Sequence, residues 1–191
     1  MKAIPRSGWI SHGIVLQDVE SVADHSYSTC ALALLLADLE LKRGRNVDVE
    51  RVLRMALIHD LPESLTFDIS KEYLKYLGKR GDAMKRELDR SAWKHITNGL
   101  RDPTLQRTYT GLQKEFEEER TFESQIVRAA DRLDILLQII AYRRRGYDNF
   151  MLEDIWSETN KKLRSSRIAS ARNLRITLLR EAKELAARKV R

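Results

Sequence analysis

The sequence predicts an all-α fold in a single domain that spans residues 1–191. Core-facing residues recur at the alternating steps of three and four that mark one face of a helix, as in Val22, His25, Thr29, Leu32, Leu36 and Leu39. Capping residues and glycine stops separate such stretches, and no stretch is a convincing strand. The length suits one sizeable core, and three prolines with eight glycines leave little room for linkers.

The chain is expected to begin with an irregular arm and then a long helix. Pro5 and two glycines punctuate residues 1–20, where no period dominates. Ser21, with an acidic residue three positions later, can form a capping box. The helix that it caps runs to about Leu41 and stops before Gly44.

A second helix is capped by Asp48. It is expected to stop at Leu61, because Pro62 disfavours helical geometry in the residue before it. Glu63 is thereby placed in a loop. A short helix capped by Ser70 follows.

Five helical segments are predicted in the rest of the chain. Asp82, Asp102 and Thr121 cap the first three of them. The third is apolar nearly all round, which indicates that it is central or shared with another subunit. The predicted spans are residues 83–98, 103–119, 122–145, a short segment over 150–156, and a basic C-terminal helix from about Arg167 within residues 160–191.

The net charge of +7 is concentrated at one end of the chain. Residues 161–191 hold eleven Lys or Arg and two Glu, so the remainder is slightly acidic. A basic helix can bind nucleic acid or an acidic partner. Its leucines and the absence of interleaved aromatic residues favour the solvated outer face of a packed helix instead.

Composition also bears on the compartment. The longest apolar run, residues 30–37, is too short to span a bilayer, and the first residues lack the apolar core of a signal peptide. A single cysteine excludes an intrachain disulfide. We therefore expect no membrane association and a cytoplasmic location.

An apolar stretch ends abruptly in His59 and Asp60. Helical spacing from Val52 and Ala56 carries both onto the buried side of their helix. Burying an unpaired carboxylate costs several kcal/mol, so Asp60 needs a partner, and a metal ion shared with His59 is the simplest one. Taken alone, such a pair is more often a histidine hydrogen-bonded to its surroundings.

Two more helices present ligand-type side chains on apolar faces. His25 lies on the core-facing line of its helix, where a lone histidine is more often a satisfied core residue, and Asp131 and Asp134 lie on the buried helix 122–145. Two imidazoles and two carboxylates without a thiolate suit one Mn²⁺, Co²⁺, Mg²⁺, Zn²⁺, Fe²⁺ or Ni²⁺ ion. Four protein ligands also leave room for water and substrate. The candidate ligands are His25, His59, Asp60 and Asp131.

The N-terminal arm carries a second pair of candidate residues. Arg6 and Trp9 lie close together in an irregular segment, which suits an anionic ligand with a flat or sugar-like body. An arm whose tryptophan fills a gap in the core is an equally good interpretation.

The order of the four candidate ligands resembles the HD-domain superfamily of metal-dependent phosphohydrolases, and within it the 5′-deoxynucleotidase family. The similar segments are Pro5-Arg6-Ser7-Gly8-Trp9, Glu20-Ser21-Val22-Ala23-Asp24-His25, His59-Asp60-Leu61-Pro62-Glu63 with Asp68, and Ala130-Asp131-Arg132-Leu133-Asp134. They cover about residues 5–150. The resemblance implies an HD-domain helical bundle with a metal site between core helices, and hydrolysis of deoxynucleoside 5′-monophosphates to deoxynucleoside and phosphate.

The resemblance also implies roles for single residues. Glu63 would orient or deprotonate the metal-bound water, Arg6 would pair with the 5′-phosphate, and Trp9 would pack on the sugar. Asp60 and Asp131 would face the substrate as well as the metal. Asp68 and Lys71 would meet the sugar and its 3′-hydroxyl, and Asp134 would support the site without binding the metal.

Two alternative functions stay open. One is another HD-type phosphohydrolase, acting on a cyclic nucleotide, a phosphodiester or a nucleoside triphosphate. Only Arg6, Lys71 and Arg132 are expected near the site, which is few for a polyphosphate. The other is a nucleic-acid-binding protein that uses the basic C-terminal helix.

A homodimer is expected as well. The apolar surface of helix 122–145 exceeds what one neighbouring helix covers, and the family resemblance points the same way.

Overall fold

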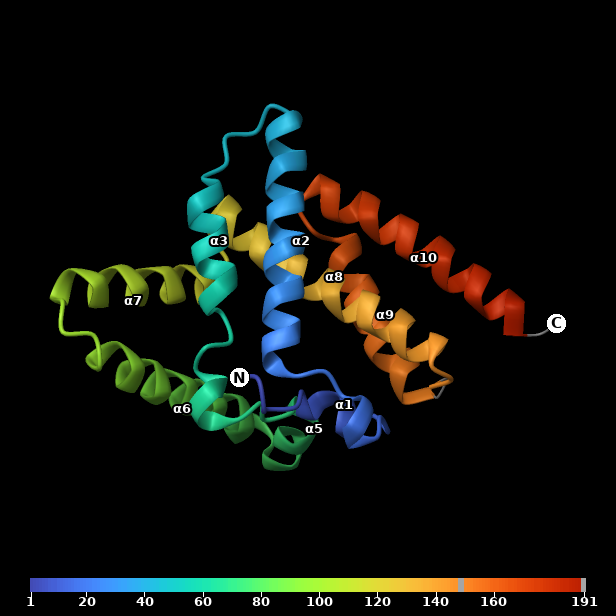
Figure 1. Cartoon of the computed structure of the whole chain (residues 1–191), viewed down its shortest axis with the longest axis horizontal. Coiled ribbons are helices and arrows are strands. Elements are labelled where there is room, and N and C mark those ends of the chain that lie inside the picture. The colour runs from blue at the N-terminus through green and yellow to red at the C-terminus, as the bar shows by residue number, and fades with distance from the viewer. Residues whose placement is uncertain (148–149, 190–191) are drawn as a thin grey trace.

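Helices make up nearly all of the regular structure in the computed structural model, which describes residues 1–147 and 150–189, without the side chains of residues 71, 188 and 189 (Figure 1). Within those ranges the only β-type pairing is an isolated bridge between Pro5 and Ser21. The all-α prediction is therefore confirmed. The elements are α1 (Ser7–Ser11), η1 (Leu16–Asp18), α2 (Val22–Lys42), α3 (Val49–Ile58), α4 (Glu63–Thr66), α5 (Lys71–Leu74), η2 (Lys75–Leu77), α6 (Lys79–Asn98), α7 (Pro103–Glu118), α8 (Phe122–Arg144), α9 (Phe150–Arg164) and α10 (Ala169–Lys189), where η marks a 3₁₀ helix.

Helix α8 is the centre of the core. It packs against α2, α3, α7, α9 and α10, and it buries apolar side chains on several sides, among them Ile126, Leu133, Leu136 and Ile139. Figure 1 shows α8 passing behind α2, with α9 and α10 on one side and the α6–α7 pair on the other. Of its large apolar side chains only Leu137 is exposed.

Helices of the same chain cover the apolar surface of α8 from which a homodimer was predicted. The sequence indicated that α8 has more apolar surface than one neighbour covers, and five neighbouring helices of the same chain now cover it. A second subunit is not needed for that purpose. Self-association would therefore use another surface.

Four of the predicted capping residues are confirmed, whereas Asp82 is not a cap and lies in the first turn of α6, which begins at Lys79. Ser21 Oγ accepts a hydrogen bond from the backbone N–H of Asp24 at 3.2 Å, and Asp24 Oδ2 accepts one from the N–H of Ser21 at 3.0 Å. Asp48, Asp102 and Thr121 likewise accept backbone N–H bonds at the starts of α3, α7 and α8. Each of these caps satisfies N–H groups that have no partner inside the helix.

Three short helices lie where irregular chain was predicted. Residues 1–20 contain α1 and η1, because Trp9 is buried and the chain turns around it. Glu63 begins α4 instead of lying in a loop. Pro62, read as a terminator of α3, has φ −54° and so also suits the start of the next helix.

Several boundaries also differ from the prediction. α6 begins at Lys79, directly after Gly78, whose φ of +54° lets the chain reverse before the helix. α9 extends to Arg164, well beyond the predicted segment 150–156, because Trp156, Thr159 and Leu163 continue its buried face. The basic region 160–191 is therefore the end of α9 followed by α10. No described helix is long and apolar enough to cross a membrane.

We expect Gly81→Ala to destabilise the protein by about 1–3 kcal/mol, the usual cost of overpacking. Gly81 is buried in α6, and a Cβ there would lie 3.0 Å from the backbone carbonyl carbon of Leu74. The matched control is Gly111→Ala in α7, where the added Cβ would meet nothing within 4 Å beyond its own stretch of helix. That change should stabilise the helix by roughly 0.5–1 kcal/mol. Urea unfolding measures both, and equal effects would contradict the packing of α5 against α6.

Candidate metal centre

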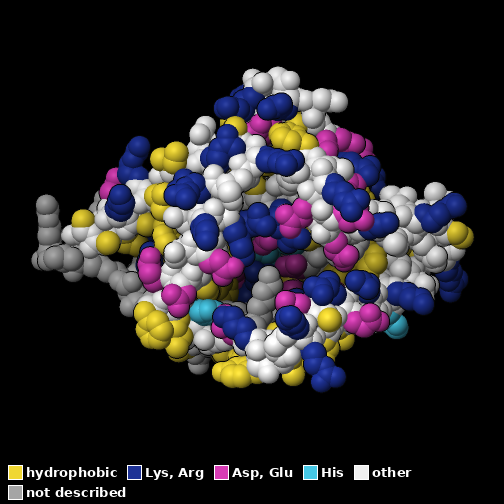
Figure 2. Space-filling view, turned by 180° about the vertical axis from the view of Figure 1, so that it is seen from behind, with side chains coloured by type: hydrophobic (Ala, Val, Ile, Leu, Met, Phe, Trp, Pro, Cys, Tyr) yellow, Lys and Arg dark blue, Asp and Glu magenta, His cyan; other side chains and the backbone are white. Residues whose placement is uncertain are grey.

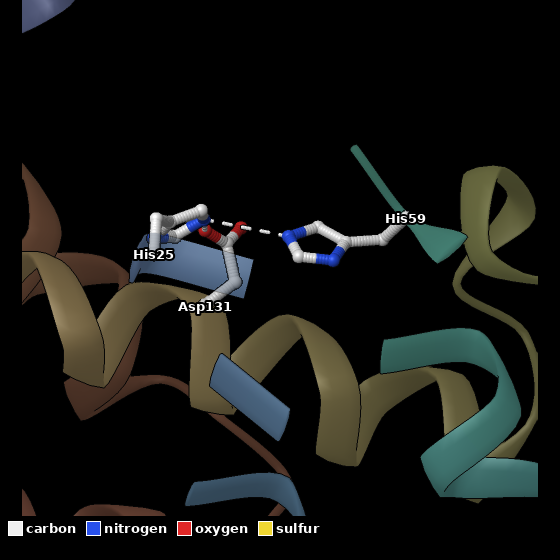
Figure 3. A group of neighbouring side chains, drawn as sticks. All are labelled: His25, His59 and Asp131. Carbon is white, nitrogen blue, oxygen red and sulfur yellow. Dashed lines mark hydrogen bonds and ion pairs between the residues drawn. The ribbon is translucent and has the colours of Figure 1, made fainter. Parts of the chain in front are cut away.

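Three helices bring the predicted ligands to one point. His25 lies near the start of α2, His59 directly follows α3, and Asp131 lies in the middle of α8. One ligand-type atom from each lies within 4.8 Å of the other two. Figure 3 shows the three side chains directed toward one another, and both histidines are buried.

Asp60 completes the group of four predicted ligands. Its Oδ2 lies 3.4 Å from Nε2 of His25 and 3.4 Å from Nε2 of His59. On the other side Asp131 Oδ1 lies 3.5 Å from the same nitrogen of His25. The structure therefore brings all four residues together around the two imidazole Nε2 atoms.

The outer nitrogens of both histidines are already engaged. His25 Nδ1 donates to Asp134 Oδ2 at 2.7 Å, and His59 Nδ1 donates to the carbonyl oxygen of Ala56 at 2.8 Å. Protons on Nδ1 leave both Nε2 lone pairs directed inward, where the two atoms lie 3.4 Å apart. Two facing lone pairs at this distance need a proton or a metal ion between them.

The charges of the site also indicate that positive charge is needed between these side chains. Burial would raise the pKa values of Asp60 and Asp131, but the neighbouring histidines and, for Asp60, Arg6 hold them below the usual range. Burial and Arg6 would lower the pKa of His25, yet the surrounding carboxylates hold it well above its usual value. Burial lowers the pKa of His59. In the metal-free protein a proton on His25 therefore supplies positive charge, and a divalent cation fits the same donor set.

A second group of ligand-type atoms shares His25. It consists of Glu20, His25 and Asp134. His25 Nδ1 is already bonded to Asp134, and Glu20 Oε1 accepts a hydrogen bond from Trp9 Nε1 at 2.7 Å. The group around the Nε2 atoms is therefore the better candidate for a metal.

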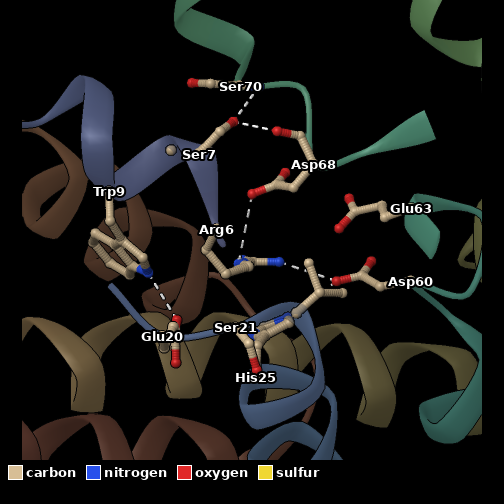
Figure 4. A network of polar contacts seen from close by, with 12 residues as sticks. Arg6, Ser7, Trp9, Glu20, Ser21, His25, Asp60, Glu63, Asp68 and Ser70 are labelled. Atoms are coloured by element: carbon tan, nitrogen blue, oxygen red, sulfur yellow. Dashed lines mark hydrogen bonds and ion pairs between the residues drawn. The ribbon is translucent and has the colours of Figure 1, made fainter. Parts of the chain in front are cut away.

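The N-terminal arm closes one side of the site (Figure 4). Arg6 Nη1 donates to Asp60 Oδ2 at 3.0 Å, and Arg6 Nε lies 4.0 Å from Asp68 Oδ2. Ser7 Oγ donates to the carbonyl oxygen of Asp68 and accepts from the N–H of Ser70 at 3.0 Å. These contacts hold Arg6 next to the candidate metal ligands although 54 residues separate it from Asp60.

Trp9 is packed as a core residue. It is 4% exposed, and its ring lies edge to face with Tyr142 at 5.2 Å between centroids. Its indole N–H is used by Glu20. The alternative interpretation, an arm whose tryptophan fills a gap in the core, thus describes its surroundings well, while the part that is still accessible faces the cavity.

Glu63 lies beside the metal centre with one oxygen unpartnered. Oε2 is buried and has no hydrogen-bond partner among the described residues, and Oε1 lies 3.9 Å from Lys85 Nζ. Burial, together with the charges of Asp60 and Asp68, raises the pKa of Glu63 to about 9. A water molecule can supply the missing hydrogen bond to such a carboxyl group, and added positive charge nearby lowers its pKa.

A cavity of about 570 Å³ opens over the metal centre. Figure 2 shows the hollow, with acidic and histidine side chains inside and Lys and Arg side chains around it. His25 lies beneath it, completely buried. The side chain of Lys71 lies outside the described part of the chain, so the structure says nothing of its predicted role. The predicted residues that line the cavity are Arg6, Trp9, His59, Asp60, Glu63, Asp68 and Asp131.

The expectation that only Arg6, Lys71 and Arg132 lie near the site is wrong. Four other basic residues line the cavity: Lys85, Arg86 and Arg90 from α6, and Arg128 from α8. Arg132 points elsewhere and pairs with Glu119 at 3.6 Å. The α6 residues were missed because contacts of α6 with α4 and α5 bring them there, and the sequence carries no signal for that packing.

Comparisons with known proteins agree on one family. A family model described as HD domain matches residues 1–171. The protein called 5′-deoxynucleotidase HDDC2 in Dictyostelium discoideum is 29% identical over 167 residues, which cover 85% of this chain and 84% of that protein. Its namesake in Danio rerio is 30% identical over 162 residues, with 85% and 74% covered.

Solved structures share the fold. A conserved hypothetical protein from Pyrococcus furiosus superposes with a TM-score of 0.77 at 34% identity, over 94% of this chain and 93% of that one. An HD-domain phosphohydrolase from Listeria innocua has a TM-score of 0.71 over 90% and 77% of the two chains. At 24% identity this second similarity supports the fold alone.

We expect Asp134→Asn to weaken divalent-metal binding by about 10–100-fold while the protein stays folded, because the amide no longer fixes the His25 ring as the carboxylate does. Calorimetric titration of metal-stripped protein with Mn²⁺ measures the effect. The matched control is Asp38→Asn, an exposed carboxylate on the same helix as His25. Unchanged affinity in Asp134→Asn would show that the 2.7 Å contact does not orient a metal ligand.

Proposed function

This chain belongs to the HD domain family, and we propose from that premise that it is a metal-dependent 5′-deoxynucleotidase. Its substrates would be deoxynucleoside 5′-monophosphates, and its products a deoxynucleoside and phosphate. The observation that carries the proposal is the convergence of His25, His59, Asp60 and Asp131 beneath one cavity. The relatives called 5′-deoxynucleotidase support the choice of substrate.

The four ligands would hold one divalent cation. Such an ion lowers the pKa of a bound water molecule and neutralises charge on a phosphoryl oxygen. Nitrogen and carboxylate donors without a thiolate suit Mn²⁺, Co²⁺, Mg²⁺, Zn²⁺, Fe²⁺ or Ni²⁺, and the choice among these ions stays open.

Glu63 is proposed to orient the attacking water and accept its proton. Its unpartnered Oε2 is available to a water molecule, and positive charge at the metal centre would favour its carboxylate form. Lys85, at 3.9 Å from Oε1, would favour the same form.

Arg6 is proposed to bind the 5′-phosphate. One of its N–H groups is used by Asp60, and its other donors can meet phosphate oxygens in the cavity. Asp68 and Trp9 line the same cavity and are proposed to meet the sugar. A ribose 2′-hydroxyl without a hydrogen-bond partner would then weaken binding. Lys71 keeps its proposed role near the 3′-hydroxyl.

The second candidate function is hydrolysis of a phosphodiester, a cyclic nucleotide or a nucleoside triphosphate. The basic side chains of α6 in the cavity favour it. Most of this charge is already paired, however: Lys85 lies 3.2 Å from Asp89 Oδ2, and Arg90 lies 4.0 Å from Glu87 Oε2. Among the three basic α6 residues of the cavity, Arg86 alone has no carboxylate partner in the described part of the chain. A monophosphate fits this balance better.

Nucleic-acid binding through the basic C-terminal region remains an alternative function. The cytoplasmic location stays a prediction. Helix α10 packs against α2, α8 and α9, and it buries Ala171 and Leu178. Its basic residues therefore occupy the outer side of a packed helix, which favours the solvated-face interpretation.

For the main proposal, phosphate release from 5′-dAMP, 5′-AMP and 3′-dAMP is the decisive measurement. We expect metal-stripped protein to be inactive, and release from 5′-dAMP to return with Mn²⁺ or Co²⁺. Release from 5′-AMP at an equal rate would remove the preference for deoxyribose but keep the metal centre. No release from any of the three, with metal bound, would favour the second candidate function.

The same assay tests Glu63. Glu63→Gln should lower kcat by about 10²–10⁴-fold, the usual contribution of general acid–base catalysis, and leave metal affinity nearly unchanged. Glu184→Gln, at an exposed position of α10 outside the cavity, is the matched control and should keep full activity. Full activity in Glu63→Gln would remove this residue from the mechanism.

A homodimer is proposed from a surface of α2. Tyr27, Leu34 and Leu41 are 77%, 39% and 42% exposed and recur every seven residues, so they form one apolar stripe. Light scattering after size exclusion should give twice the chain mass of 22.2 kDa, and Leu34→Glu should give a monomer. Leu57→Glu, at an exposed leucine of α3, should leave the dimer intact. A monomeric wild-type protein would contradict the proposal.

A further inference from the structure

A second cavity, of about 440 Å³, lies outside the group of metal ligands. It forms where the turn between α7 and α8 meets the connection between α9 and α10, and α8 supplies one wall. Sites for small molecules commonly have volumes of about 300–1,000 Å³. The charged side chains that line it are Arg120, Arg128, Arg132, Lys162, Arg167 and Glu119.

Five basic residues line this cavity, and fewer carboxylates pair with them in the described part of the chain, which leaves a net positive charge. Lys162 pairs with Glu158 at 2.5 Å and Arg120 with Glu118 at 3.9 Å, and both of these carboxylates lie outside the lining. Glu119 Oε1 lies 2.9 Å from Arg128 Nε, and Glu119 Oε2 lies 3.6 Å from Arg132 Nη2, so both of its oxygens are used. Arg167 has no carboxylate partner within the described ranges. Basic groups gathered around one hollow repel one another, and an anion with several charges removes that repulsion.

We propose that this second cavity binds a polyphosphate chain, either inorganic or the triphosphate of a nucleotide. Arginine guanidinium groups match phosphate oxygens with paired N–H donors, which suits a chain of linked phosphates better than a single charge does. The hydroxyl groups of Ser165 and Ser166 line the same hollow and add hydrogen-bonding groups.

Arg128 connects this cavity to the metal centre. It lines both cavities, and its Nη1 lies 3.5 Å from Oδ2 of the proposed metal ligand Asp131. Its guanidinium group also stacks over the Phe116 ring, at 3.9 Å from the ring centroid, and Phe116 packs against His59. An anion in the second cavity would compete with a phosphate in the first for this one arginine. Occupancy of the second cavity should therefore weaken substrate binding.

Calorimetric titration with inorganic tripolyphosphate tests the binding site. The metal-loaded protein is used, with Mg²⁺ in excess over the probe. The double variant Lys162→Ala/Arg167→Ala should bind at least tenfold more weakly than the wild type. The matched control, Lys161→Ala/Arg164→Ala, removes the same charge from exposed positions of α9 outside the cavity and should bind like the wild type.

A parallel titration with dATP distinguishes the two sources of the chain. Tighter binding of dATP than of tripolyphosphate would identify a nucleotide site, and equal binding would identify a site for the phosphate chain alone. Equal affinity in the wild type and both double variants, or no saturable binding, would overturn the proposal.

Enzyme kinetics test the coupling between the two cavities. This kinetic test rests on the proposed function, whereas the binding test is independent of it. At saturating tripolyphosphate and fixed free metal, we expect KM for 5′-dAMP to rise about three- to tenfold with kcat unchanged. The Lys162→Ala/Arg167→Ala variant should keep its basal activity and show no such rise. Equal inhibition of all variants would place the probe in the first cavity and contradict the coupling. Loss of nucleotidase activity with intact tripolyphosphate binding would count against the proposed function alone.

Discussion

The packing of α8 against α2 and α3 imposes the main constraint on this protein, because it buries ionised groups at the junction of the three helices. Asp131 and Asp134 come from α8, His25 from α2, and His59 with Asp60 from the end of α3. Burying several carboxylates in one place is costly unless positive charge lies among them. The metal-free protein supplies that charge with His25 and Arg6, and a bound divalent cation would supply more of it.

Other elements orient the side chains at this junction and form the cavity that leads to it. Asp134 and the carbonyl group of Ala56 hold the two imidazole rings by their outer nitrogens, so that the inner nitrogens face one another. The arm before α2 is joined to the segment after α4 through Ser7, and thereby keeps Arg6 beside Asp60. Helix α6 then supplies a basic wall to the cavity.

Two arginines differ in how they relate to the two cavities. Arg6 is held by two carboxylates in the first cavity, while Arg128 faces both cavities and is shared between Glu119 and Asp131. The guanidinium group of Arg128 can therefore interact with an anion in either cavity. The two cavities are therefore physically connected through one side chain, which gives a second anion a direct way to affect the first.

The sequence by itself determined the all-α fold, the starts of most helices and the four candidate ligands, because these depend on local capping, on helical spacing and on chemically distinctive residues. Ser21, Asp48, Asp102 and Thr121 act through neighbours a few positions away, so their effect can be read without the fold. Only the tertiary structure decided which groups line the cavity. Lys85 lies on a helix with no distinctive motif, and the packing of α6 against α4 and α5 brings it to the candidate metal centre. The tertiary structure also decided what covers α8. Its apolar surface suggested a second subunit, but five helices of the same chain pack against it.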